Sequence, residues 1–138
     1  MNMMAIRDSW RALALDTSWP GNYVEVISWP VDPASLPDLW TTLLFETTEN
    51  APIGIGPLPN DHRERGFVEA WAVSRSGGGD DPAVQAAEQI RNAIWGWAFP
   101  SGMTLLEVGS PWDPVPSADG AWYQVGVRSE YMYDYVQT

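Results

Sequence analysis

The residues best suited to acid–base chemistry lie together between positions 61 and 64. His62 is the only histidine in the chain, and its neighbours are Asp61, Arg63 and Glu64. A histidine with a carboxylate is the minimum for general acid–base catalysis, but adjacent side chains point in different directions and no nucleophile is marked nearby. A single histidine without the spacing of a ligand set also builds no dedicated metal site. We therefore interpret His62 as a solvated loop residue and expect no catalytic residue and no metal site.

Two glycine-rich segments, residues 54–56 and 77–79, are the candidates for binding a phosphate. The second precedes the expected start of a helix, where backbone amides can hold an anion. Neither segment carries the P-loop lysine or the glycine spacing of a dinucleotide site, and Asp80 and Asp81 would repel an anion. The absence of cysteine excludes disulfides, thiolate metal sites and a cysteine nucleophile. The sequence thus predicts no cofactor and no enzyme.

Arg63 and Arg65 are the charged residues that point most clearly to an interaction. They are two of only seven basic residues in the chain, and both fall in a segment rich in proline and glycine. An arginine at such a place can pair with a carboxylate of a neighbouring subunit or touch passing DNA. The alternative is a local salt bridge to Asp61 or Glu64.

The composition describes one folded, acidic domain. The 138 residues are 45% hydrophobic, and 18 acidic against 7 basic side chains give a formal charge of -11. Such a surface repels phosphate backbones and anionic lipid heads, so we expect neither specific DNA binding nor membrane binding. Residues 1–15 carry Arg7, Asp8 and Arg11 within an apolar stretch, which predicts no signal peptide, no membrane span and synthesis inside the cell.

Aromatic residues are unusually frequent, with nine Trp, five Tyr and three Phe. Aromatic side chains supply much of the binding energy at contacts between subunits. The pattern therefore favours an oligomer in which some rings lie at interfaces. A bulky core with a few exposed rings explains the same count and stays open as an alternative.

The elements that must position these residues follow from periodicity and turn signals. We expect an α+β fold, in which a four- to five-stranded antiparallel or mixed sheet carries one main helix and a short N-terminal helix. The chain is expected to be a single domain, residues 1–138, with an N-terminal helix and extended segment over residues 1–38. The expected elements are a helix at 5–16, strands at 23–29 and 39–48, a long loop at 50–66, a strand at 67–75, a helix at about 81–98, a strand at 103–108, a loop at 109–120 and a last strand at 123–135.

The main helix and one strand carry complementary patterns. In the strand at 67–75, Val68, Ala70 and Ala72 share one face, and these small residues would let a helix approach closely. Asp80 and Pro82 mark a helix start by an acidic N-cap and an early proline. The apolar stripe of this helix is predicted to consist of Ala83, Ala87, Ile90, Ile94 and Trp97.

The order of these elements and the residue pattern of the C-terminal half resemble a known family. The resembling residues are Arg65 and Gly66 before FVEAWAVSR, the break SGGGDDP, the helix AVQAAEQIRNAIWGWAF and the closing GAWYQVGVRSEYMYDY, which together span about Leu39 to Tyr135. In this combination they look like the tail terminator, or tail completion, proteins of long-tailed bacteriophages and gene-transfer particles. Residues before Leu39 match no pattern of that family.

The resemblance implies a structural virion protein at the head-proximal end of the tail, assembled in the host cytoplasm. Such a subunit forms a homo-oligomer, a six-membered ring that caps the tail tube, ends its polymerisation and joins the tail to the head connector proteins. Genome DNA would pass through its acidic lumen without specific binding. Candidate residues for the contact with a neighbouring subunit or the tail are Ile53, Ile55, His62, Arg63, Arg65 and Trp112.

Two other classes of protein stay open from the sequence. Another head–tail connector protein or a tail tube subunit would share the ring geometry. A small acidic protein that mimics DNA would instead be monomeric and would bind a basic partner tightly.

Overall fold

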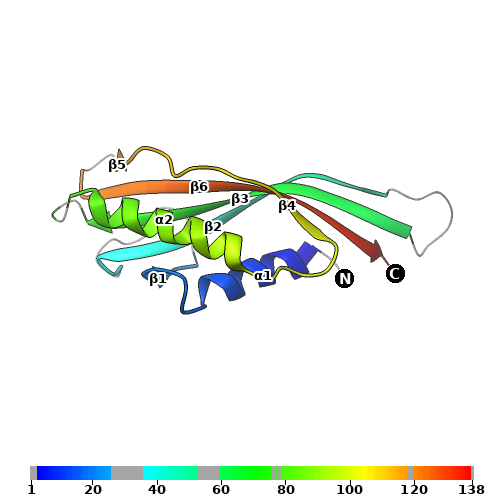
Figure 1. The fold of residues 1–138 in the computed structure, drawn as a ribbon. Coiled ribbons are helices and arrows are strands. Elements are labelled where there is room, and N and C mark those ends of the chain that lie inside the picture. Colours follow the sequence, from blue (N-terminus) through cyan, green and yellow to red (C-terminus); the bar gives the residue numbers. More distant parts are fainter. Residues whose placement is uncertain are drawn as a thin grey trace.

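The computed structural model describes residues 3–25, 36–52, 60–75, 77, 79–117 and 120–137. These residues form one mixed sheet of six strands and two helices, so the predicted α+β fold is confirmed (Figure 1). Two of the six strands are only two residues long. The elements are α1 (Met3–Ala14), β1 (Asn22–Tyr23), β2 (Leu39–Pro52), β3 (Asn60–Arg75), α2 (Asp81–Gly96), β4 (Met103–Val108), β5 (Val115–Pro116) and β6 (Trp122–Gln137).

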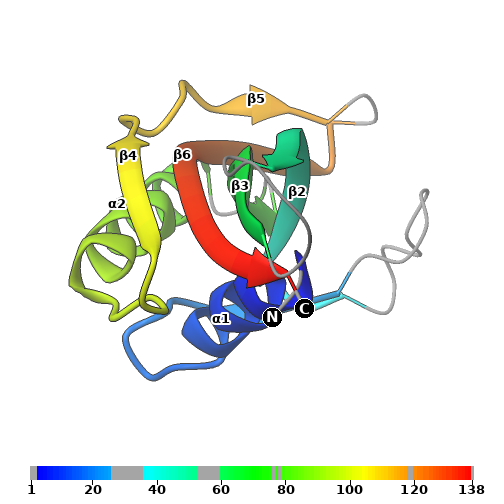
Figure 2. The same cartoon turned by 90° about the vertical axis from the view of Figure 1, so that its right-hand side faces the viewer.

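The sheet is built around β3, which pairs with β2 on one side and with β6 on the other. The strand order is β1-β2-β3-β6-β4, and β5 pairs with β6 beyond the end of β4. All neighbouring strands are antiparallel except β1, which runs parallel to β2. Both helices lie on one side of this sheet and the segment that carries β5 lies on the other (Figure 2).

The segment predicted as a long loop at 50–66 is largely strand, and that prediction is wrong. β2 continues to Pro52 and β3 begins at Asn60, so the two strands form a hairpin arm that extends beyond the helices (Figure 1). The polar residues of β3 in this arm are paired with a strand on each side. Arg63, for example, lies opposite Ala51 of β2 and opposite Asp134 of β6. A register shift between Thr47 and Glu49 lets β2 continue past Gly66.

Helix α1 buries the face that its periodicity predicts. Ile6, Trp10, Leu13 and Ala14 are buried, and the Trp10 ring packs against Phe99 with centroids 4.8 Å apart. The helix begins and ends about two residues earlier than predicted. The strand predicted at 23–29 is confirmed at Tyr23 and is wrong at Val24 and Glu25, which follow β1 without being part of a strand. Residues 26–29 lie outside the described part of the chain.

Helix α2 packs on the small side chains of β3, as the sequence predicts. Val68, Ala70 and Ala72 are buried together with Val125 and Val127 of β6. The buried helix residues are Ala83, Ala86, Ala87, Ile90, Ala93 and Ile94, which include four of the five predicted stripe residues. The fifth, Trp97, is the extended C-cap residue, because the helix ends at Gly96 rather than at about 98. Asp80 is the N-cap but makes no side-chain capping bond.

Candidate interaction surface

The sheet has one face covered by the helices and one face without a helix, which we call the open face. Side chains directly opposite in the ladder share a face, so Trp40 and Val73 lie together, as do Thr42 and Trp71. The ladder between β3 and β6 adds Gln124 beside Val73. The open face therefore carries large apolar residues, and Trp40 and Val73 are buried there in a small second core with Trp122.

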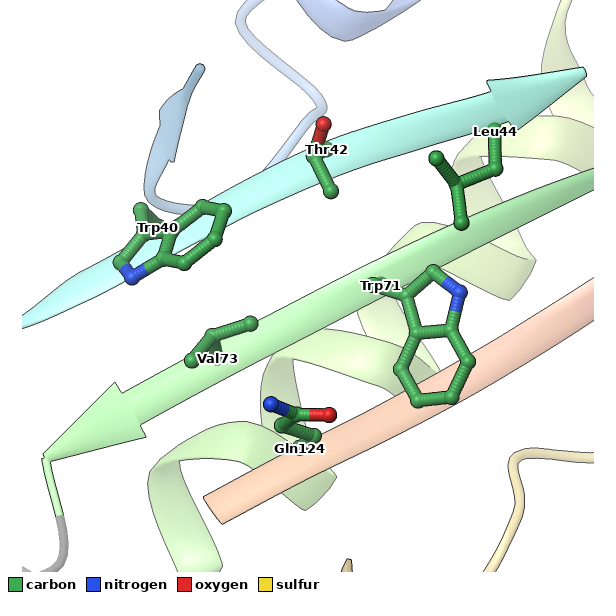
Figure 3. A pocket seen from close by; sticks show the side chains of 6 residues that line it. All are labelled: Trp40, Thr42, Leu44, Trp71, Val73 and Gln124. Carbon is green, nitrogen blue, oxygen red and sulfur yellow. The ribbon is translucent and has the colours of Figure 1, made fainter. Parts of the chain in front are cut away.

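A groove lies on the open face and is bounded by side chains of three strands (Figure 3). Its volume is about 240 Å³, and its lining residues are Trp40, Thr42 and Leu44 of β2, Trp71 and Val73 of β3, and Gln124 of β6. Figure 3 shows these side chains on the side of the strands away from α2. Trp40 packs edge-on against Trp122 with centroids 6.4 Å apart, whereas Leu44 is 40% exposed. The groove is thus bounded by packed tryptophan rings at the Trp40 end, and its apolar edge at Leu44 is accessible to solvent.

Two polar atoms in the groove wall are buried without a hydrogen-bond partner among the described residues. They are Trp40 Nε1 and Thr42 Oγ1. An unsatisfied buried donor or hydroxyl costs about 1–3 kcal/mol, and native proteins contain few of them. Unpaired buried atoms also occur away from the groove, at Trp10 Nε1 and Ser129 Oγ, so these two atoms do not by themselves mark the groove as a binding site.

Trp112 lies beside the groove and is held by contacts with the sheet. Its ring packs edge-on against Trp71 with centroids 5.0 Å apart, and its backbone N–H donates to the carbonyl oxygen of Gly126 at 2.9 Å. A Cβ at Gly126 would lie 2.7 Å from Trp112 Cε3, so glycine allows the indole to rest on β6. Trp112 nevertheless stays 40% exposed.

Arg63 and Arg65 project from the open face of the hairpin arm, but both pair within the chain. Arg63 donates to Asp134 through Nε at 2.8 Å and Nη2 at 3.0 Å. Arg65 lies 3.8 Å from Glu49. These partners are cross-strand neighbours, and neither is Asp61 or Glu64, which the sequence offered as the alternative local partners. The hydrogen bonds and charge of Arg63 hold the pKa of the Asp134 carboxyl below its usual value.

His62 lies on the opposite face of the arm, stacked on Tyr135 with centroids 5.7 Å apart. It is a strand residue rather than a loop residue. Ile53 and Ile55 lie outside the described residues. Of the four predicted interface residues that the structure describes, only Trp112 therefore borders the groove.

The most enclosed titratable pair is Glu64 with Tyr131. Glu64 is 1% exposed, and the Tyr131 hydroxyl donates to Glu64 Oε2 at 2.6 Å. Burial and this hydrogen bond raise the pKa of the Tyr131 phenol above its usual value. The pair is sealed under the helix side of the sheet, away from the groove, so its position is that of a structural pair rather than an accessible acid or base.

The sequence analysis missed the groove residues as a site. The signal that could have revealed them is an apolar pattern on both faces of adjacent strands, since Trp71 and Val73 alternate with Ala70 and Ala72, and Trp40 and Leu44 with Thr41 and Leu43. Across the described ranges, no three histidine or carboxylate side chains gather as a metal ion would require. Over the same residues, neither helix is long and apolar enough to cross a membrane.

Comparison with known proteins identifies the fold and nothing finer. No protein-family model matches the sequence, and no curated protein is significantly similar to it. Among solved structures, 24 chains match. One of them has a TM-score of 0.62 and 18% sequence identity, with 100% of this chain and 97% of that chain covered. Its name states no function, and at this identity the match shows a shared fold alone.

Proposed function

We propose that this chain is a structural subunit of a ring, and that the ring is a tail terminator of a long-tailed phage or gene-transfer particle. In this role the ring caps the tail tube, ends its polymerisation and presents a surface to the head connector. The resemblance of residues 39–135 to that family motivates the specific role. The structure supports only the more general part of the proposal, namely that this chain assembles with other protein chains.

The observation that carries the proposal is the apolar groove on the open face. Monomeric proteins seldom expose contiguous apolar patches larger than about a few hundred Å², and larger patches mark interaction sites. Here Leu44 and Trp112 are exposed beside the groove, and Val115 of β5 is 53% exposed. A partner that covers the groove would remove these residues from water, which is the usual driving force of association.

The charge of the chain fits a ring through which DNA passes. A formal charge of -11 on each subunit multiplies around a ring, so phosphate groups are repelled rather than captured. The arginines of the hairpin arm are neutralised by Asp134 and Glu49, which leaves them poor anchors for a phosphate backbone. We expect the purified protein to show no retention on duplex DNA at physiological salt.

The test is capping of tail tubes. Tubes polymerised from the major tail protein encoded in the same gene neighbourhood would be mixed with this protein and imaged by negative-stain electron microscopy. A tail terminator is expected to appear as a ring at one end of each tube and to stop further elongation. Incorporation along the tube would indicate a tail tube subunit instead. A monomer that ignores tubes but binds a basic protein tightly would support the DNA-mimic class and overturn the proposal.

A further inference from the structure

An exposed tryptophan lies on the helix side of the molecule, opposite the groove. Trp95 of α2 is 59% exposed, whereas the buried residues of α2 face the sheet. It is the most exposed of the aromatic side chains that the structure describes. The groove lies on the other face of the same sheet (Figure 3). One chain thus presents an aromatic projection on one side and an apolar recess on the other.

The sizes of the two features match. A closed apolar cavity of roughly 150 Å³ holds a benzene molecule. The groove measures about 240 Å³ and is open along the Leu44 rim, which leaves room for the larger indole ring. Its walls already contain Trp40 and Trp71, and aromatic rings pack favourably edge-to-face.

The charges beside the two features also match. All seven basic residues are arginines, and six of them contact a described carboxylate or aromatic ring. The seventh, Arg91, lies one turn before Trp95 and has no such partner within the described residues; its buried Nε is also unsatisfied. Beside the groove, Glu69 accepts a hydrogen bond from Trp71 Nε1 at 3.2 Å and pairs with no described cation. An unpaired arginine therefore accompanies the projection and an unpaired carboxylate accompanies the recess.

We propose that Trp95 of one copy inserts into the groove of the next copy, with Arg91 of the first facing Glu69 of the second. Because the two surfaces lie on opposite sides of the chain, the contact is heterologous and repeats from copy to copy. Such a contact closes into a ring or continues as a filament, depending on the rotation between copies. The inference deepens the proposed function and rests on it for the closure of the ring.

The chain contains no cysteine, so pairs of introduced cysteines report the contact directly. Asn92 is an exposed neighbour of Trp95 on α2, and Gln124 lines the groove. A protein carrying Asn92→Cys, mixed with one carrying Gln124→Cys, is expected to form a mixed dimer with a bifunctional maleimide reagent. Either variant alone should stay uncross-linked. The control pairs Asn92→Cys with Leu15→Cys, which is exposed outside both surfaces, and should give no product.

The variant that carries both Asn92→Cys and Gln124→Cys in one chain separates the contact from the proposed function. A cross-linked ladder that stops at a fixed size supports both the contact and the ring. A ladder that continues without limit supports the contact but overturns the ring. A ring seen by light scattering without any ladder overturns the contact and leaves the ring. Absence of both ladder and ring at the highest soluble concentration overturns both.

Point substitutions measure how much the contact contributes. Trp95→Ala is expected to weaken self-association at least about 30-fold, as loss of a buried aromatic hot spot does. Leu44→Glu should have a similar effect from the other surface, because it places a carboxylate at the apolar rim. Leu15→Ala is the control, an exposed apolar residue outside both α2 and the groove lining, and should leave association unchanged. Equal effects of all three variants would contradict the inference.

Discussion

At the scale of single residues, the buried Glu64 is held by one tyrosine from the neighbouring strand. Tyr131 stands opposite Gly66 in the ladder, and a Cβ at Gly66 would lie 2.9 Å from the Tyr131 hydroxyl. The glycine lets the ring lie across β3 so that its hydroxyl reaches Glu64 Oε2. Glu64 Oε1 is buried and has no partner among the described residues, so the tyrosine supplies the hydrogen bond on which this carboxyl depends.

Tyr131→Phe is therefore expected to destabilise the protein by about 1–3 kcal/mol, the usual cost of leaving a buried hydrogen-bonding group without its partner. The aromatic ring and its packing remain in this variant, so the loss of free energy of unfolding measures the contribution of the hydroxyl group. Urea unfolding followed by circular dichroism gives the free energy of unfolding. In a Glu64→Met background the same substitution should cost much less, because the carboxyl that needs the bond is gone. An equal cost in both backgrounds would assign the effect to something other than this pair.

The Arg63–Asp134 pair predicts a pH dependence of stability. The pKa of Asp134 is lowered in the folded protein by the hydrogen bonds and charge of Arg63. A lowered carboxyl pKa stabilises the folded state at pH values above the usual pKa of 3.8. This contribution is lost as the pH falls through the lower pKa of the folded state. Asp134→Asn should therefore lower the urea midpoint at pH 7, and the difference from the natural chain should start to shrink as the pH falls toward 3.8 and vanish only below the lowered folded pKa. Arg63→Gln should remove the same pH dependence; a difference that persists in acid would contradict this account.

At the scale of elements, the contact between α2 and β3 is the part of the structure that the sequence predicts best. Small residues at every second position of a strand and a stripe of alanines on a helix specify a close approach of the two. Ala87 is fully buried in this contact, while Gln85 of the same helix is exposed.

Ala87→Leu should overpack the contact and lower the free energy of unfolding by about 1–3 kcal/mol. Gln85→Leu is the matched control, because it adds an apolar side chain of the same kind to the exposed side of α2. Its effect on stability should fall within about 0.5 kcal/mol. Thermal and urea unfolding of both variants measure the difference. If the two variants were equally stable, α2 would not pack as tightly on β3 as the structure indicates.

The hairpin arm and the groove could not be predicted in the same way. Residues 60–66 are polar on both faces and follow a segment with several prolines and glycines, which is the composition of a loop. They become strand because β2 and β6 pair with them on both sides, a tertiary contact with no local signature. Predicting the groove requires the register between β2 and β3, because the register decides which side chains share a face of the sheet. That register is fixed by long-range pairing.

At the scale of the whole molecule, the proposed self-association would bring together chains that repel one another. Each copy carries a formal charge of -11, and the contact of Trp95 with the groove is mainly apolar. The Arg91–Glu69 pair is a single attraction at the rim of that contact, where ion pairs contribute about 0.2–1 kcal/mol. Repulsion between the acidic surfaces therefore dominates the electrostatic part of assembly.

This balance predicts that added salt strengthens assembly. Raising the ionic strength from about 0.01 M to about 0.15 M shortens the screening length from about 30 Å to about 8 Å, which suppresses repulsion between whole surfaces and leaves apolar burial intact. Sedimentation equilibrium at the two salt concentrations should show a larger mean mass at the higher one. Trp95→Ala should associate weakly at both, because screening cannot replace the lost apolar contact. Assembly that weakens as salt is added would mean that ion pairs hold the copies together, and the apolar contact between α2 and the open face would then be the wrong interface.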